Sequence, residues 1–155
     1  MAKITSGIDP TDLRLLEVLR DDGRISIAAL AAAIGVSRAN AYTRLERLRE
    51  DGVIKGFTVR IDHEKIGLDV TAISFLKVRQ PARQVLSEPL RRIPGIEYAA
   101  FVTGEQDVIV KMRAPDVRTL RDETMSRLSE EQPVQGLNTI LVLDEIVDRP
   151  FVLPG

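Results

Sequence analysis

Residues 26–50 read SIAALAAAIGVSRANAYTRLERLRE, and this stretch gives the clearest structural signal in the first sixty residues. Ser26 is expected to cap a short alanine-rich helix, because a serine hydroxyl accepts hydrogen bonds from the free backbone N–H groups at a helix N-terminus. Gly35 is expected to end this helix, and Ser37 to cap the next one, over 38–50. A small-residue helix, a glycine-containing turn and a helix with a polar outer face together predict a helix-turn-helix.

The helix expected over 38–50 is basic and has two distinct faces. Segment 37–49 holds four arginines against one glutamate, a local net charge of 4 − 1 = +3, so any bound anion is expected there. At 100° per residue, the apolar side chains separate from the polar ones. The apolar face carries Ala41, Leu45 and Leu48, and the opposite face carries Ala39, Asn40, Thr43 and Arg47.

The polar face of this helix has the chemistry that reads DNA. A helix fits the major groove, where arginine can pair with guanine and asparagine with adenine through two hydrogen bonds each. Arg38 stands near the N-terminal end, where a recognition helix usually meets base edges. Serine hydroxyls and nearby backbone N–H groups suit phosphates. The residues expected to contact DNA are Arg24, Ser26, Ser37, Arg38, Asn40, Tyr42, Thr43, Arg44 and Arg47.

A plain helical bundle is the alternative to DNA binding. Helix surfaces are commonly rich in arginine, so the charges by themselves favour a solvated surface. The complete pattern, in which Ser26, Ala31, Gly35, Val36 and Ser37 precede a basic helix, favours DNA binding.

A further helix is expected upstream, over about 10–22. Asp9 suits its N-cap, Pro10 its first position, and Asp12 the positive end of the helix dipole. Leucines at helical spacing follow. Gly23 is expected to end the helix in a left-handed conformation.

The rest of the chain shows strand patterns. Val53 to Asp62 (VIKGFTVRID) is expected to form a strand that leads into a linker containing His63 and Gly67. The order that follows is β-α-β-β-α-β, which predicts a ferredoxin-like domain with an antiparallel sheet. Strands are expected at 70–79, 96–103, 108–112 and 134–147; one helix buries Val85, Leu86, Leu90 and Ile93, and the other, capped by Asp116, carries Val117, Leu120, Thr124 and Leu128.

The expected fold class is therefore α+β. A winged-helix-like helix-turn-helix domain occupies 1–52, a strand and linker 53–69, the ferredoxin-like effector-binding and oligomerisation domain 70–149, and a tail 150–155. Helices cover one face of such a sheet, yet apolar residues occur on both faces of its strands, among them Ile73, Phe75, Ile140 and Val142. A partner subunit is the favoured explanation, and a strand register shifted by one residue is the alternative.

Composition excludes several classes of protein. The 155 residues are 44% hydrophobic and 29% charged, which is ordinary for a globular protein. There is no cysteine and one histidine, so disulfides, thiolate metal sites and multi-histidine zinc sites are excluded. No apolar run reaches the ~20 residues of a membrane span, and the start lacks a signal-peptide pattern, so a cytoplasmic location is expected. No nucleophile–base set or phosphate loop emerges; we expect neither an enzyme nor a cofactor or metal.

The chain resembles the leucine-responsive regulatory protein/AsnC family, also called feast/famine regulators, over residues 8–149. The N-terminal resemblance runs from Asp9 through DGR at 22–24 and the helix-turn-helix stretch to GVI at 52–54. The C-terminal resemblance consists of PGI at 94–96, VTGEQD at 102–107 and TILVL at 139–143. This resemblance implies a transcription regulator that binds double-stranded DNA and whose C-terminal domain responds to an amino acid or a related metabolite.

The same resemblance implies an effector site and an assembly. In that family, dimers commonly assemble into tetramers or octamers, and amino-acid effectors bind between dimers near the turn that joins the second and third strands of the domain. Backbone N–H groups at the turn would take a carboxylate, and its acidic side chains an ammonium. A plain hairpin turn explains the glycine and aspartate equally well. Carried over by position, the effector-binding residues are Gly104, Glu105, Gln106, Asp107, Gln135 and Thr139.

Two other functions remain open at this point. One is a chromosome-architectural DNA-binding protein without an effector response, which would occupy many sites with similar affinity. The other is a metabolite-binding subunit that regulates an amino-acid enzyme, which would bind amino acids but no DNA at low salt.

Overall fold

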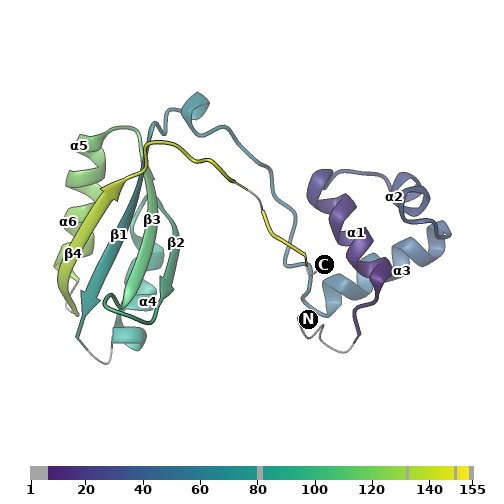
Figure 1. The fold of residues 1–155 in the computed structure, drawn as a ribbon, viewed down its shortest axis with the longest axis horizontal. Coiled ribbons are helices and arrows are strands. Elements are labelled where there is room, and N and C mark those ends of the chain that lie inside the picture. The colour runs from purple at the N-terminus through teal and green to yellow at the C-terminus, as the bar shows by residue number, and fades with distance from the viewer. Residues whose placement is uncertain (1–6, 80–81, 132, 149, 154–155) are drawn as a thin grey trace. The chain divides into compact units, whose positions relative to one another are not determined.

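The computed structural model describes residues 7–79, 82–131, 133–148 and 150–153, without the side chains of 82–84. The chain divides into two compact units. The first contains residues 1–60 together with 147–155, and the second contains 61–146. Figure 1 shows the helices of the first unit and the sheet of the second.

Three helices build the first unit: α1 (Pro10–Asp21), α2 (Ile27–Ile34) and α3 (Arg38–Glu50). The expected caps are present. The Ser26 side chain accepts a hydrogen bond from the backbone of Ala29, and Ser37 does the same for Asn40. Gly35 ends α2 in the left-handed region, with φ +72°. The helix-turn-helix predicted from residues 26–50 is therefore confirmed.

The end of α1 differs from the expectation. Gly23 is outside the left-handed region, and Asp22 takes the C-cap position in an extended conformation. The backbone N–H of Asp22 donates to the carbonyl of Val18, and its side chain accepts from the backbone of Arg24 at 2.9 Å. A side-chain turn at Asp22 replaces the glycine turn, so the expected role of Gly23 was wrong.

The three helices enclose one apolar core. Its buried members are Leu15, Leu16, Leu30, Ala31, Ile34, Ala41 and Leu48. Leu153, close to the C-terminus, packs against this cluster, so part of the expected tail belongs to the helical unit. The two faces expected for α3 are correct for Ala41 and Leu48, which are completely buried.

The strand expected over 53–62 does not form. Phe57, Val59 and Ile61 are 53%, 75% and 48% exposed, and these residues belong to no strand of the described chain. A strand needs a neighbour that completes its backbone hydrogen bonds. Within the described residues the sheet begins at Val70, so the β-like pattern of this segment has no partner in its own chain.

The second unit has the predicted order of elements. After a short 3₁₀ turn, η1 (Glu64–Ile66), come β1 (Val70–Val78), α4 (Ala82–Arg92), β2 (Ile96–Phe101) and β3 (Val108–Ala114). One continuous helical stretch follows, made of α5 (Val117–Thr119), a π-helical segment η2 (Leu120–Met125) and α6 (Ser126–Glu130), and then β4 (Val134–Leu141). The sheet is antiparallel with the strand order β2-β3-β1-β4, which confirms the ferredoxin-like fold.

The helices cover one face of this sheet. Figure 1 shows α4, α5 and α6 on the same side. The core between sheet and helices includes Leu76, Val110 and Met112 from the strands, with Leu86 from α4 and Leu128 from α6. Alternation along β3 is therefore as predicted.

Two helix positions and several strand ends differ from the expectation; β2 ends at Phe101 and not at residue 103, and β3 continues beyond residue 112 to Ala114. Val85 and Val117 are 50% and 54% exposed, although the apolar spacing placed them in the core.

The last strand ends at Leu141 and does not continue to Val147. Regular pairing of β4 with β1 ends at Leu141, which lies opposite Ala72. One further hydrogen bond, from the backbone N–H of Val142 to the carbonyl of Thr71 at 2.9 Å, continues along β1.

The uncovered face of the sheet carries a cluster of apolar side chains. Ile73 of β1 lies opposite Ile140 of β4, and Phe75 of β1 lies opposite Ile109 of β3. Ile140 is 48% exposed, and the others are half-buried. The expected register of this face is correct, and no helix of the described unit packs on it.

Candidate nucleic-acid interface and effector turn

The first turns of α3 present a polar surface to solvent. Arg38, Asn40, Tyr42 and Thr43 are exposed, as is the capping residue Ser37. Arg24 and Ser26, which precede α2, are exposed as well. Each serine uses its oxygen as an acceptor for its own helix, so its O–H stays available to donate to a phosphate.

Arg44 and Arg47 face the first helix. Arg44 Nη1 donates to Asp9 Oδ2 at 2.6 Å and to Asp12 Oδ1 at 2.8 Å. Arg47 Nη2 donates to Asp12 Oδ2 at 2.6 Å. The expectation that Arg47 lies on the outer face of α3 with Asn40 is therefore wrong. A helical projection at 100° per residue gives only the direction in which each Cα–Cβ bond points. A long arginine side chain can bend away from that direction to reach a buried carboxylate.

The carboxylate of Asp12 is the centre of this arrangement, because its side chain has no exposed surface. Burial raises the pKa of Asp12. Hydrogen bonds from the backbone N–H of Asp9 and from the guanidinium groups of Arg47 and Arg44 together lower it by more, so its pKa is below the usual value. Asp9 also has a lowered pKa, chiefly because Arg44 donates to it. The network holds α1 and α3 together with charged hydrogen bonds.

Because of this network and a local ion pair, fewer arginines of α3 are free to bind an anion than the sequence alone suggests. Arg44 and Arg47 are paired with α1, and Arg49 pairs with Glu46 at 2.8 Å. Arg38 makes no ion pair with any residue that the structure describes. The positive charge that α3 offers to an anion is thus concentrated at its N-terminal end.

The turn between β2 and β3 is closed by Asp107. Its carboxylate accepts a hydrogen bond from the backbone N–H of Val78 at 3.0 Å and pairs with the Lys77 ammonium at 3.3 Å. The Val78 N–H is the main cause of the lowered pKa of Asp107, and Lys77 lowers it further. Lys77 also donates to the carbonyl of Glu105 at 2.8 Å. Gly104 adopts φ +125° with open space around it.

The six residues carried over for an effector are only partly brought together. Gly136, the neighbour of Gln135, lies opposite Lys77, so Gln135 and the 104–107 turn flank the same end of β1. Thr139 is further along β4, where its hydroxyl lies 2.6 Å from that of Ser74, a completely buried residue on the helix-covered face. Thr139 is therefore apart from the turn.

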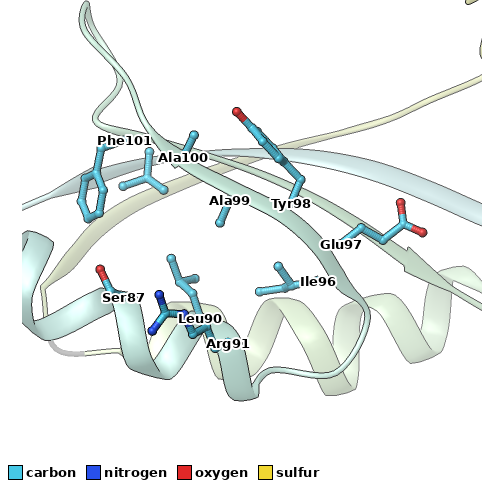
Figure 2. Close-up of a pocket in the computed structure, with 10 residues that line it drawn as sticks. Ser87, Leu90, Arg91, Ile96, Glu97, Tyr98, Ala99, Ala100 and Phe101 are labelled. Atoms are coloured by element: carbon cyan, nitrogen blue, oxygen red, sulfur yellow. The ribbon is translucent and has the colours of Figure 1, made fainter. Parts of the chain in front are cut away.

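Sequence reasoning missed two features of these surfaces. It treated Asp9 and Asp12 only as capping residues, and it did not select Lys77, whose signal is a single basic residue at the end of an alternating strand. The structure also holds a cavity of about 470 Å³ between α4 and the edge strand β2. Figure 2 shows Leu90 and Ile96 facing into this cavity, whereas Tyr98 points away from it.

Two other kinds of feature are absent from the described part of the chain. No helix there is long and apolar enough to cross a membrane. No group of three or more histidine, aspartate or glutamate side chains within those ranges is arranged to hold a metal ion.

Comparison with known proteins places both halves of the chain. Residues 8–55 match a winged helix-turn-helix DNA-binding family, and residues 71–152 match the Lrp/AsnC ligand binding domain. The proline dehydrogenase transcriptional activator of Rhizobium radiobacter is 30% identical over 145 residues, which cover 92% of this chain and 93% of that protein.

Solved structures show the same fold. Bacillus subtilis LrpC is 25% identical with a TM-score of 0.81, over 92% of this chain and 99% of that one. A transcriptional regulator of Neisseria meningitidis, solved as an L-Met complex, superposes with a TM-score of 0.85 at 23% identity, over 94% and 96% of the two chains. These matches confirm the resemblance read from the motifs. The chain belongs to the Lrp/AsnC family of transcription regulators.

Proposed function

We propose that this regulator reads its operator through the exposed N-terminal half of α3. The observation that carries the proposal is that Arg38, Asn40, Tyr42 and Thr43 are exposed together on a helix tied to α1 by the buried carboxylate of Asp12. A side chain can discriminate between bases only if the backbone that carries it is held in place. We infer a cytoplasmic, non-enzymatic protein, in keeping with relatives named as transcription regulators.

The proposal divides the exposed residues into base-reading and phosphate-binding groups. Arg38, at the N-terminal end of α3, suits two hydrogen bonds to guanine, and Asn40 suits adenine. The hydroxyls of Ser26 and Ser37, with Arg24, suit phosphates and set the position of the helix on the duplex. Tyr42 and Thr43 complete the surface.

The regulator is proposed to act as a homodimer formed through the uncovered face of the sheet. A partner's sheet would cover Ile73, Phe75, Ile109 and Ile140, which water otherwise contacts. A two-fold dimer predicts a pseudo-palindromic operator with half-sites about 10 bp apart, or a multiple of that spacing. Association of dimers into tetramers or octamers is part of the same proposal.

We propose that an amino acid binds at the 104–107 turn. Its carboxylate would meet the Lys77 ammonium and the free N–H groups of the open turn, and Gln135 would supply a further polar contact from the other side of β1. Because Asp107 is already engaged by Val78 and Lys77, it positions Lys77 and leaves the effector's ammonium to Glu105. The L-Met complex of a structural neighbour supports the choice of amino acids as the class to be tested.

Measured DNA affinity tests the first part of the proposal. The wild-type chain is used to select its operator from a pool of random duplexes, and binding is then followed by fluorescence anisotropy at several salt concentrations. Arg38→Ala is expected to lose discrimination at one base position. Arg49→Ala, on the same helix but paired with Glu46, is the matched control and is expected to keep that discrimination. Absence of DNA binding at low salt would refute the proposal and favour a regulatory subunit of an enzyme.

Thermal-shift measurements with the twenty amino acids test the effector. A ligand that binds the folded state raises the melting temperature. Lys77→Met is expected to abolish this shift, and Lys55→Met, an exposed lysine outside the sheet unit, to preserve it. Footprinting on a long DNA, with and without the amino acids, separates a regulator from an architectural protein, since the latter would protect many sites equally and show no response.

A further inference from the structure

We infer that Arg44 is a positioning residue for DNA reading: its guanidinium orients the carboxamide of Asn40 while Asp9 and Asp12 neutralise its charge. The inference rests on the proposed function, in which the outer face of α3 reads base edges. It gives Arg44 a different role from the direct DNA contact that its place in the basic segment suggests.

The guanidinium of Arg44 joins α3 to the start of α1. Its Nε donates to Asn40 Oδ1 at 2.8 Å, one helical turn earlier on α3. Its Nη1 donates to Asp9 Oδ2 at 2.6 Å and to Asp12 Oδ1 at 2.8 Å. Because the guanidinium is planar, bonds at Nε and Nη1 together fix its orientation. Only 22% of the Arg44 side chain is exposed.

The two carboxylates are themselves held by other groups. Asp12 Oδ2 accepts from the backbone N–H of Asp9 at 2.9 Å and from Arg47 at 2.6 Å. Asp9 Oδ1 accepts from the backbone N–H of Asp12 at 2.9 Å. Every carboxylate oxygen of the pair therefore has a donor, and a fully satisfied polar network in a partly buried place is rigid. Because Arg44 is held by this network, its hydrogen bond to Asn40 also restrains the Asn40 side chain.

The hydrogen bond from Arg44 fixes the orientation of the Asn40 carboxamide, that is, the positions of its oxygen and its NH₂ group. Reading adenine requires the amide oxygen on one side, to accept from N6, and the amide nitrogen on the other, to donate to N7. An unrestrained carboxamide has two orientations related by a flip. The Nε–H of Arg44 is a donor only, so it selects the oxygen and leaves the NH₂ group for the partner. The oxygen keeps a second lone pair for the base.

The charges of the network predict the salt dependence. Asp9 and Asp12 carry −2 and Arg44 and Arg47 carry +2, so the cluster is neutral overall. An arginine that releases counterions from DNA changes the slope of log affinity against log salt by about one. Arg44 is already neutralised by carboxylates, so replacing it is expected to leave that slope unchanged.

The test compares base discrimination in matched variants of the full chain. Arg44→Lys keeps a cation for the two carboxylates but cannot also hold Asn40, because an ammonium lacks the extended fork. A two-bond base contact provides about 5- to 150-fold discrimination, and we expect Arg44→Lys to lose about 3- to 10-fold of it. The loss should fall at the base position that Asn40→Ala also affects, with the salt slope unchanged. Arg49→Lys is the matched control and should change neither quantity.

The double variant separates positioning from a general structural effect. If Arg44 acts through Asn40, Arg44→Lys combined with Asn40→Ala should show no further loss of discrimination beyond Asn40→Ala alone. A merely structural role would instead weaken binding to all sequences equally. Two results would overturn the inference. One is unchanged discrimination in Arg44→Lys. The other is a uniform loss of affinity in the charge-removing variant Arg44→Ala with a salt slope reduced by about one, which would make Arg44 a phosphate contact.

A measurement without DNA covers the case in which Arg44→Lys does not fold. In the wild type, the Nε–H resonance of Arg44 should exchange slowly with water, and Asn40→Ala should shift it and speed its exchange. An unaffected resonance would refute the contact. The proposed function fails separately: a wild-type chain without base preference refutes both ideas, whereas a base preference that depends on Asn40 but not on Arg44 refutes only this one.

Discussion

Arg47 Nη2 donates a hydrogen bond of 2.6 Å to Asp12 Oδ2, which joins helix α3 to the first helix of the unit. Asp12 is completely buried, whereas 37% of the Arg47 side chain is exposed. A buried carboxylate is tolerated only when it is paired and hydrogen-bonded. The position of the proposed DNA-reading surface therefore depends on Asp12, a residue that does not reach that surface.

Replacing Asp12 is expected to destabilise the helical unit. Asp12→Asn removes the charge but keeps the size, and it leaves Arg44 and Arg47 without their shared partner. Breaking a buried ion pair costs about 3–5 kcal/mol, and we expect the lower end because both arginines remain partly solvated. Urea unfolding followed by circular dichroism at 222 nm measures this change. Asp21→Asn, whose carboxylate is exposed, is the control and should change stability by less than about 0.5 kcal/mol.

The same carboxylate should make the unit sensitive to acid. The native pKa of Asp12 is lowered relative to the unfolded value of about 3.9. Its stabilising effect is therefore complete above the unfolded pKa and is lost as the pH falls through the lowered native pKa. The difference in unfolding free energy between the wild type and Asp12→Asn should be constant near neutral pH and shrink below about pH 4. A difference that stays constant down to pH 2.5 would contradict this assignment.

Gly95, between α4 and β2, should tolerate no side chain. Its φ is +80°, and a Cβ there would overlap the carbonyl oxygen of Arg113. Gly95→Ala combines backbone strain with overpacking, each worth about 1–3 kcal/mol, so a loss of at least about 2 kcal/mol is expected. In a unit of this size that lowers Tm by roughly 8 °C or more. Gly56→Ala meets open space and should leave Tm unchanged in the same thermal scan.

The uncovered face of the sheet should hold the dimer together. Ile140→Glu places a charge within the apolar face, where a partner's sheet would bury it without a counter-charge. We expect this variant to sediment as a monomer at concentrations at which the wild type is a dimer. Val117→Glu alters a valine of similar exposure, 54% against 48% for Ile140, at the start of the helices. Dissociation by both variants, or by neither, would argue against the proposed face.

Local signals in the sequence predicted much of this protein. Serine and aspartate caps, together with Gly35, correctly placed all three helices of the first unit to within one residue. Alternation correctly placed β3 and the order of elements around it. These features are local because a cap or a strand face depends on residues only a few positions apart. The motifs also predicted the family, which the comparisons confirm.

Features that need a partner distant in the sequence could not be predicted from local patterns. Residues 53–62 have the composition of a strand, yet they form none because a ladder of hydrogen bonds requires a neighbour. Thr139, expected near the effector, instead faces Ser74 on the helix-covered side.

The contrast is sharpest on α3. Local signals suffice to predict that residues 38–50 form a basic helix, because the cap and the apolar spacing act within one or two turns. Only the fold decided which arginines face solvent, because Arg44 and Arg47 find their carboxylates 32 and 35 residues earlier in the chain. A buried charge must be paired wherever the fold brings a partner, and helical spacing carries no information about that partner.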